Sequence, residues 1–429
     1  KISSTGTYSL FLKSDGSLWG MGQNYYGQLG IGVFSTNSPE GTNRPVMIEP
    51  GGVTTISGGL ATSLFITTDG SLWGTGDNLY GQLGIGYFST NFPYGTNRPV
   101  LVTNGVVAIS ASDSSLFLKA DGSLWGMGYN FYGQLGDGTD TNRNLPEQIL
   151  SGGVTAISAG ANDGLFLKSD GSLWAMGNNQ YGQLGIGTFS TNSPYGTNEP
   201  AMVTNGVVAA ACGLDFGLFL KNDGSLWAMG ENNVGQLGDG TKSNRSLPVL
   251  IVTNGVTSIA AGSSHTLFLK SDGSLWGTGY NLFGQLGDGT TNSMVTPEMI
   301  VTNGVTAIAA ASNHSLFVKS DGSLWAMGEN TFGELGDGTF NNTNRPVQIL
   351  AGVPSSYDRL SGLLLNDGDV QLSFVGLTGT NYALERTFNL QPPDWIPQAT
   401  NPAGPLGQLL FTNMPDPATN NFWRIRLVP

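Results

Sequence analysis

The pentapeptide Asp-Gly-Ser-Leu-Trp, which occurs seven times, constrains the fold of this chain more than any other feature. The copies begin at Asp15, Asp69, Asp121, Asp170, Asp223, Asp272 and Asp321. Their tryptophans are 54, 52, 49, 53, 49 and 49 residues apart. A period of about fifty residues with strand-like content is typical of a ring or array of small β-sheets. The repeat predicts an architecture and says little about what the protein binds.

One repeat, residues 154–203, shows the expected elements. Short apolar runs at 154–158, 165–168, 173–176 and 201–203 predict four strands, which match one propeller blade. Asp-Gly between the second and third runs predicts a tight hairpin with positive φ at both central residues. The first run has small side chains throughout the repeats, because strands at a propeller axis are crowded. Cys212 falls in this run and is expected to be a small buried residue. The repeated Trp and Leu-Phe residues are expected to fill the space between blades.

The repeats resemble those of the regulator of chromosome condensation family. Their marks are the Trp strand, an Asn and a Gly-Gln-Leu-Gly turn, which becomes Gly333-Glu-Leu-Gly336 in the seventh copy. The resemblance covers residues 1 to about 352 and implies a seven-bladed β-propeller. The family includes a nuclear nucleotide-exchange factor, a plant photoreceptor and a secreted bacterial inhibitor of β-lactamases. The near-identical copies are most similar to exported bacterial members.

Composition excludes several functions. The net charge is −13, but eleven of the 24 acids in residues 1–352 belong to the repeated turns, and the other 13 match 13 basic residues. Without a basic stripe, we expect no nucleic-acid partner. No apolar run reaches the length of a membrane span. The lone Cys212 allows no intrachain disulfide. The chain begins at Lys1 without Met, which suggests a removed signal peptide or a trimmed chain.

No motif predicts an enzyme, a cofactor or a metal. Only two histidines are present, and no phosphate-binding Gly-rich loop or metal-spaced cluster occurs. The Gly-Asp-Gly-Thr turns lack the further acidic ligands of a calcium loop. We therefore expect a non-enzymatic protein without a cofactor.

Two sets of variable positions are candidate partner-binding sites, since variation on a rigid scaffold is where recognition can reside. The first lies two residues before each Leu-Phe pair and is expected to form a ring on one face near the axis. Its members are Tyr8, Thr62, Ser114, Asp163, Phe216, His265 and His314. Tyr8, Asp163 and Phe216 are the better candidates here, because His is common at this position in the family and is expected to be a structural hydrogen-bonding residue.

The second set is the loop after Gly-Gln-Leu-Gly, which is long in repeats 1, 2 and 4 and short in the others. Ile accompanies the long loops (Ile31, Ile85, Ile186) and Asp accompanies the short ones (Asp137, Asp239, Asp288, Asp337). Asp is expected to cap a tight turn through backbone amides, whereas Ile is expected to pack under Phe34, Phe88 or Phe189. Phe92, Tyr94 and Tyr195 either face a partner or only cover the blade edge.

After residue 352 the repeat stops. Alternating polar and apolar runs, such as 370–374, 382–386 and 422–427, predict a small β-sandwich-like module at 353–429. Trp395 and Trp423 are expected in its core, and the tail could also supply a strand that closes the ring. The fold class is therefore all-β, a seven-bladed β-propeller at 1–352 followed by this module.

Two functional hypotheses remain. The first is a secreted, bacterial, non-enzymatic propeller that engages a protein partner through variable loops on one face. The second is a multivalent carbohydrate-binding or self-assembling extracellular surface protein, favoured by near-identical long loops, because identical sites increase avidity.

Overall fold

The computed structural model describes residues 1–193, 195–352, 361–364, 370–375, 381–387, 396–402, 408–413 and 422–427. Strands form its regular structure, and none of the described residues lies in a helix that could cross a membrane. The chain divides into two compact units, one of residues 1–319 and 324–350 and the other of residues 320–323 and 351–429.

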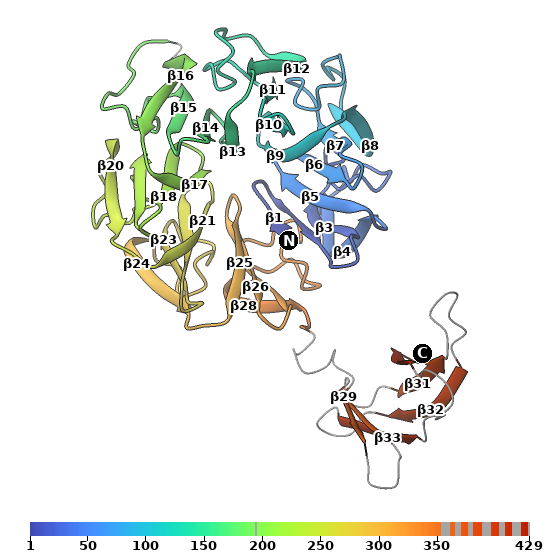
Figure 1. Ribbon diagram of the computed structural model, residues 1–429. Coiled ribbons are helices and arrows are strands. Elements are labelled where there is room, and N and C mark those ends of the chain that lie inside the picture. Colours follow the sequence, from blue (N-terminus) through green and yellow to red (C-terminus); the bar gives the residue numbers. More distant parts are fainter. Residues whose placement is uncertain are drawn as a thin grey trace. The chain divides into compact units, whose positions relative to one another are not determined.

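The first unit is a ring of seven four-stranded antiparallel sheets around a central axis, which confirms the seven-bladed propeller (Figure 1). Blades 1 to 4 consist of β1 (Ile2–Ser3), β2 (Tyr8–Leu12), β3 (Leu18–Gln23), β4 (Gly41–Glu49); β5 (Val53–Gly58), β6 (Thr62–Thr67), β7 (Leu72–Asp77), β8 (Gly95–Thr103); β9 (Val106–Ala111), β10 (Ser114–Lys119), β11 (Leu124–Gly128), β12 (Arg143–Leu150); β13 (Val154–Ala159), β14 (Asp163–Lys168), β15 (Leu173–Asn178), β16 (Gly196–Thr204).

Blades 5 to 7 repeat this order from the axis outward. They consist of β17 (Val207–Cys212), β18 (Phe216–Lys221), β19 (Leu226–Gly230), β20 (Arg245–Val252); β21 (Val256–Ala261), β22 (His265–Lys270), β23 (Leu275–Gly279), β24 (Met294–Val301); β25 (Val305–Ala310), β26 (His314–Lys319), β27 (Leu324–Gly328), β28 (Thr343–Leu350).

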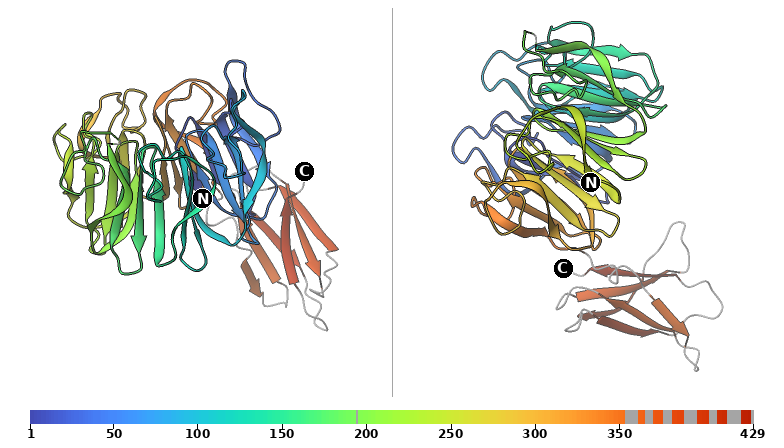
Figure 2. Two further views of the ribbon diagram at one scale, coloured as in Figure 1. Left: turned by 90° about the horizontal axis from the view of Figure 1, so that it is seen from above. Right: turned by 90° about the vertical axis from the view of Figure 1, so that its left-hand side faces the viewer.

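The antiparallel order gives the propeller two distinct faces, seen edge-on in Figure 2. One face carries the connections from the first to the second strand and from the third to the fourth strand of each blade, and we call it the loop face. The hairpin face carries the Asp-Gly turns between second and third strands and the connections between blades. The long and short variable loops both lie on the loop face.

The Asp-Gly turns differ in one respect from the expected geometry. Gly16 has a φ of 80°, but Asp15 is not among the residues with positive φ. The amide of Gly16 donates to Lys13 O at 3.1 Å, and that of Lys13 donates to Ser17 O at 3.0 Å. This is a three-residue hairpin loop in which only the last residue is left-handed. Asp15 instead accepts the amide of Ser17 at 2.9 Å, which explains the Ser in the pentapeptide.

The core lies between the blades. In all seven blades, buried leucines share a cluster with the Phe of the next blade's second strand. Leu64 and Leu83 of blade 2, for example, cluster with Phe117 and Met127 of blade 3. The repeated tryptophans pack against these clusters and remain half-buried, so the expectation of inter-blade packing is confirmed although the indoles keep an exposed edge.

In the part of the chain that the structure describes, the ring closes without a strand from the tail. β1, the innermost strand of blade 1, comes from the N-terminus, and all four strands of blade 7 are consecutive. Ser9 Oγ lies 2.8 Å from His314 Nε2 and donates to Glu334 O at 2.8 Å. At the outer edge, Asn43 Nδ2 donates to Gly338 O at 2.9 Å. The alternative of a closing strand from the tail is not seen among the described residues: hydrogen bonds and the apolar cluster of Phe11 with Leu316 join blade 7 to blade 1.

The second unit contains two small antiparallel sheets among its described residues. Their strand orders are β29-β30-β33 and β32-β31-β34, formed by β29 (Ser361–Leu364), β30 (Val370–Val375), β31 (Asn381–Thr387), β32 (Ile396–Pro402), β33 (Gln408–Asn413) and β34 (Phe422–Leu427). Trp395 lies outside the described residues, whereas Trp423 falls in β34.

Candidate interaction surface

The inner ring of variable residues forms, but it is buried. Each member is the first residue of its blade's second strand. Tyr8, Asp163, Phe216 and His265 are 0% exposed, and His314 is 1% exposed. The expected surface ring is therefore corrected, because each of these side chains lies in the interior of the ring of blades, under the connection that precedes it. In this conformation none of the five presents a surface to a partner.

The contacts of the ring residues are structural. His265 Nε2 lies 2.9 Å from Ser315 Oγ of blade 7, just as His314 reaches Ser9 of blade 1. Tyr8 Oη donates to Thr62 O at 2.7 Å in blade 2. Burial lowers the pKa of His265 to about 4 and of His314 to about 3, so both rings are neutral at pH 7. The two histidines are inter-blade hydrogen-bonding residues, as the family resemblance implies.

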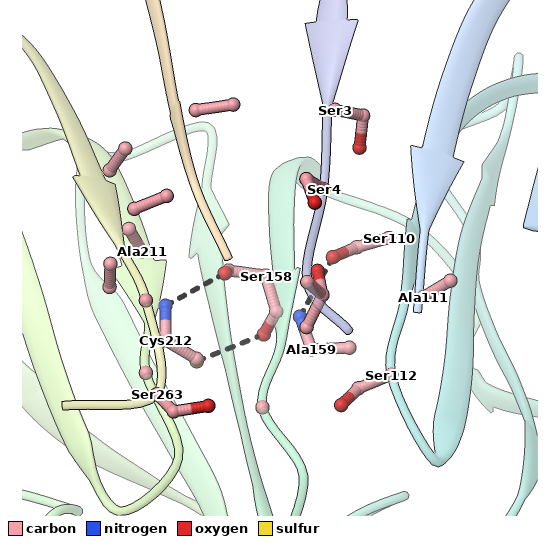
Figure 3. Close-up of a pocket in the computed structure, with 18 of the residues that line it drawn as sticks. Ser3, Ser4, Ser110, Ala111, Ser112, Ser158, Ala159, Ala211, Cys212 and Ser263 are labelled. Atoms are coloured by element: carbon pink, nitrogen blue, oxygen red, sulfur yellow. Dashed lines mark hydrogen bonds between the residues drawn. The ribbon is translucent and has the colours of Figure 1, made fainter. Parts of the chain in front are cut away.

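The axis holds a cavity of about 200 Å³ lined by the innermost strands and the N-terminal segment (Figure 3). Its serines join neighbouring blades: Ser110 Oγ accepts the amide of Ala159 at 2.9 Å, and Ser158 Oγ accepts that of Cys212 at 2.9 Å. Cys212 Sγ also lies 3.2 Å from Ser158 O. Small polar residues at the axis thus serve the packing of the blades, as expected for this crowded strand.

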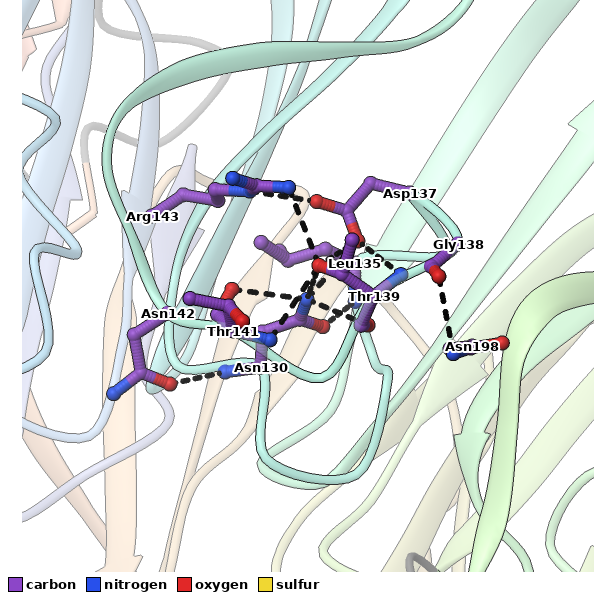
Figure 4. A network of polar contacts seen from close by, with 9 residues as sticks. All are labelled: Asn130, Leu135, Asp137, Gly138, Thr139, Thr141, Asn142, Arg143 and Asn198. Atoms are coloured by element: carbon purple, nitrogen blue, oxygen red, sulfur yellow. Dashed lines mark hydrogen bonds and ion pairs between the residues drawn. The ribbon is translucent and has the colours of Figure 1, made fainter.

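The Asp of each short loop caps its turn. Asp137 Oδ1 accepts the amide of Thr139 at 3.0 Å and a bond from Asn130 Nδ2 at 3.1 Å, and Oδ2 pairs with Arg143 Nε at 2.7 Å (Figure 4). Asp239, Asp288 and Asp337 accept the corresponding Thr amides at 2.8–2.9 Å. The interpretation of these residues as turn caps is confirmed. Among the described residues, no group of three or more His, Cys, Asp or Glu side chains could hold a metal ion.

The three long loops share one ordered backbone. Glu40, Tyr94 and Tyr195 occupy the same position with φ between 61° and 66°. Their carbonyl groups accept the amides of Asn24, Asn78 and Asn179 at 2.7–2.8 Å. Ile31 and Ile85 pack against the blade core, whereas Ile186 is 38% exposed and is not part of the apolar cluster of blade 4. The backbone hydrogen bonds are therefore common to all three long loops, whereas packing of the Ile against the blade core occurs in two of them.

Aromatic side chains, two of them exposed and six partly buried, gather on the loop face of blades 1 to 3. Tyr25 contacts Tyr26 and also Phe92 of the blade-2 long loop, with ring centroids 5.0 and 5.5 Å apart. Phe92 is 54% exposed and lies 5.9 Å from Tyr94. We call the following set the aromatic arc: Tyr25, Tyr26, Tyr80, Phe92, Tyr94, Tyr129, Phe131 and Tyr132.

A second group of aromatic rings in the arc joins blade 2 to blade 3. The rings of Tyr80 and Tyr129 are 4.7 Å apart, and Tyr129 stacks on Phe131 at 6.5 Å. Phe131 is 50% exposed. Tyr195, the third candidate of the long loops, is half-buried and makes no ring contact with any described aromatic residue. The structure thus joins Phe92 and Tyr94 into one patch and leaves Tyr195 outside it.

Carboxylates lie on the same face, with Asp77 and Asp113 near arc tyrosines and Asp215 in blade 5. Gln82 Nε2 donates to Asp77 Oδ2 at 3.0 Å, and Gln183 Nε2 donates to Asp215 Oδ1 at 3.0 Å. Burial raises the pKa of Asp77 and Asp215, and burial together with the charge of Asp77 raises that of Asp113 to about 6. The repeated Gln therefore has two roles. Its Oε1 accepts an amide of its own turn, and in blades 2 and 4 its Nε2 donates to an Asp on the loop face.

Sequence reasoning missed most of the arc. Tyr25, Leu79, Phe131, Gln180, Asn233, Leu282 and Thr331 follow the repeated Asn in the seven blades, so this position varies as strongly as the inner ring. That variation was the available signal. The two contacts that cross between blades, Tyr25 with Phe92 and Tyr80 with Tyr129, are not revealed by any spacing within one repeat.

Comparison with known proteins places the chain in a family. The model of the RCC1-like domain matches residues 111–370, and models of the Regulator of chromosome condensation (RCC1) repeat match residues 1–28, 53–82 and 15–66. The human RCC1-like G exchanging factor-like protein is 28% identical over 165 residues, which are 38% of this chain and 36% of that protein.

Two solved structures share the fold. Human WBSCR16 has a TM-score of 0.69 at 23% identity and covers 79% of this chain and 94% of its own. Yeast RCC1 (Prp20), solved with Kap60 bound, has a TM-score of 0.69 at 21% identity and covers 80% of this chain and 85% of its own. With a domain model that matches more than half of its length, this chain belongs to the RCC1-like domain family.

Proposed function

We propose that this protein is a non-enzymatic interaction propeller, exported by a bacterium, that binds a protein partner through the aromatic arc on its loop face. The observation that carries the proposal is the pair of aromatic clusters on the loop face of blades 1 to 3, in which Phe92 and Phe131 are the exposed members. Soluble proteins seldom expose contiguous apolar patches without a function, and Tyr and Phe are enriched in protein interfaces.

The one-sided position of the arc favours a single protein interface. Phe92 stands where the other two long loops have Ser38 and Ser193. Phe131 stands where blades 4 and 5 have Gln180 and Asn233. Equivalent glycan sites on repeated loops would use residues that the loops share, whereas the two exposed members of the arc, Phe92 and Phe131, stand at positions that vary between blades. A related propeller, yeast RCC1 (Prp20), has been seen with a protein, Kap60, bound to it.

The first test is quantitative capture with matched variants. Phe92→Ser and Phe131→Gln replace arc residues by those of sister blades, which tolerate them. Leu282→Gln, at an exposed position of blade 6 equivalent to Phe131, is the control. We expect each arc variant to weaken capture of a secreted or surface protein by at least tenfold, as for a central aromatic contact, and the control to change it by less than twofold.

Two outcomes would contradict the proposal. One is a captured protein that all three variants retain equally, because its binding would then lie elsewhere. The other is a glycan-array signal that the long-loop repeats support and that Phe92→Ser leaves unchanged, since that result would favour the multivalent carbohydrate hypothesis.

A further inference from the structure

Trp73 differs from the other six pentapeptide tryptophans in its surroundings. In the other six blades a Lys Nζ lies 3.9–4.9 Å from the indole centroid. The same six indoles stack on a Phe of the paired strand, with centroids 6.0–6.4 Å apart. Within the described part of the chain, Trp73 has neither contact, although Phe65 pairs with it in register.

The indole N–H of Trp73 is also unusual. In five blades this group donates at 2.8–2.9 Å to the Ser two residues earlier. The N–H of Trp73 has no hydrogen-bond partner among the described residues. The cause begins in the sequence, because the position that is Lys in the other blades is Thr67 here. Thr67 Oγ1 is bound to Asp69 Oδ1 at 2.6 Å and does not cover the ring.

The missing cover leaves a groove of about 640 Å³ between blades 1 and 2. Its walls include Trp73, Phe65, Ile48, Glu49 and Asp69. The apolar side chains offer a surface for methylene groups, and the two carboxylates offer charge. In the other blades a lysine of the chain itself lies against the indole. In this groove the indole is present and the lysine is absent.

Glu49 is the second departure at this groove. It pairs in register with Leu18, at the hairpin end of blade 1. The equivalent residues of the other blades are uncharged: Thr103, Leu150, Thr204, Val252, Val301 and Leu350. No described residue makes a hydrogen bond or ion pair with Glu49, and burial raises its pKa. Blade 2, which has Thr67 in place of the lysine, therefore lies beside blade 1, which has Glu49 in place of an uncharged residue.

The positive charge in the groove lies at its other end. Arg98 is near the loop face, where its Nη2 is 2.8 Å from the position that a Cβ on Gly32 would take. Glu49 and Asp69 lie toward the hairpin face, at the end of β4 and in the turn between β6 and β7. The hairpin end therefore presents two carboxylates and an indole without a cation, which is a favourable setting for an ammonium group.

We propose that this groove is a binding site for a lysine side chain of a partner protein. The ammonium lies between Glu49 and Asp69 against Trp73, and its methylenes pack on Ile48 and the indole. The six lysine–indole contacts within the chain are the precedent for this geometry. The site is on the rim of the propeller and does not depend on the aromatic arc.

The test uses the full chain labelled with ¹⁵N-tryptophan and the probe Nα-acetyl-lysine methylamide. The indole signal of Trp73 is assigned with Trp73→Phe. We expect a saturable shift of this signal alone, and no shift with the neutral norleucine analogue. No shift at saturating solubility, or an equal response to norleucine, would overturn the proposal. A shift with a panel of oligosaccharides but not with the lysine probe would overturn it in favour of a saccharide site.

Matched variants sharpen the test. Thr67→Lys restores the residue of the other six blades, so its own ammonium should cover Trp73 and weaken probe binding at least tenfold. Glu49→Gln should weaken it at least fivefold, and Thr67→Ser should bind as the wild type does. Unchanged binding by both Thr67→Lys and Glu49→Gln would contradict the site. Phe92→Ser and Phe131→Gln should leave probe binding unchanged, so failure here and failure of the loop-face proposal are distinguishable.

Discussion

At the scale of the residue, Glu334 is the clearest departure from the repeat. It occupies the position of Gln in the other six turns and is 0% exposed. Its Oε2 accepts the amide of Phe332 at 2.7 Å, as Gln Oε1 does elsewhere, but its Oε1 has no partner among the described residues. Burial raises the pKa of Glu334 to about 7, and the nearby charge of Glu329 adds to the shift.

This arrangement predicts a pH-dependent effect of Glu334→Gln on stability. An unfolded Glu ionises near pH 4.5, whereas the folded one keeps its proton to about pH 7. Stability is therefore lost as the pH rises from 4.5 to 7, by on the order of 3 kcal/mol at most. Denaturant unfolding should show Glu334→Gln to be more stable than wild type at pH 8.5 and nearly equal at pH 4.5.

The reverse substitution, Gln28→Glu in blade 1, is the matched control. It should destabilise the protein at pH 8.5 and much less at pH 4.5. An equal change of stability at both pH values, for either variant, would show that ionisation of this position is not the cause.

At the scale of the element, the variable loops use two solutions for one backbone requirement. The amide of the repeated Asn bonds a backbone carbonyl in long loops but a side chain in short ones, as where Asn130 N donates to Asn142 Oδ1 at 2.8 Å. In blade 3 the ion pair of Asp137 with Arg143 further stabilises the short loop. Blade 6 has Met294 in place of this Arg.

A double-mutant cycle measures this contribution. Asp137→Asn and Arg143→Met, alone and together, should give a coupling free energy of about 1 kcal/mol in urea unfolding, because the Asp side is buried and the Arg is only partly exposed. Burial opposes ionisation of Asp137, but its bonds to Thr139 and Arg143 leave its pKa lowered, so the coupling should persist to mildly acidic pH. A coupling of zero would reduce the pair to a surface contact.

The elements also show which features the sequence could predict. The pentapeptide and the small inner strand predicted the blades, because both reflect contacts within one repeat. The Asp-Gly turn was only half right, since Asp15 prefers to cap the turn through its side chain. The inner ring was misplaced because Tyr8 and its counterparts point into the junction with the next blade. β1 was missed because it contains two residues, too few for any periodic pattern.

At the scale of the whole molecule, seven nearly equal blades carry unequal surfaces. The aromatic arc spans blades 1 to 3, and the groove at Trp73 lies between blades 1 and 2. Blades 5 and 7 have Asn233 and Thr331 where the arc has Phe131. A rigid ring with one specialised sector suits a single, directional partner better than seven equivalent ligands.

The most direct test of the loop-face interface is side-chain footprinting by hydroxyl radicals, with and without the captured partner. The account predicts that Tyr25, Phe92, Tyr129 and Phe131 lose reactivity in the complex by at least fivefold, while Leu282 and Phe340, exposed on other blades, keep theirs. Protection of Leu282 and Phe340 with an unprotected arc would contradict the assignment of the arc as the binding surface.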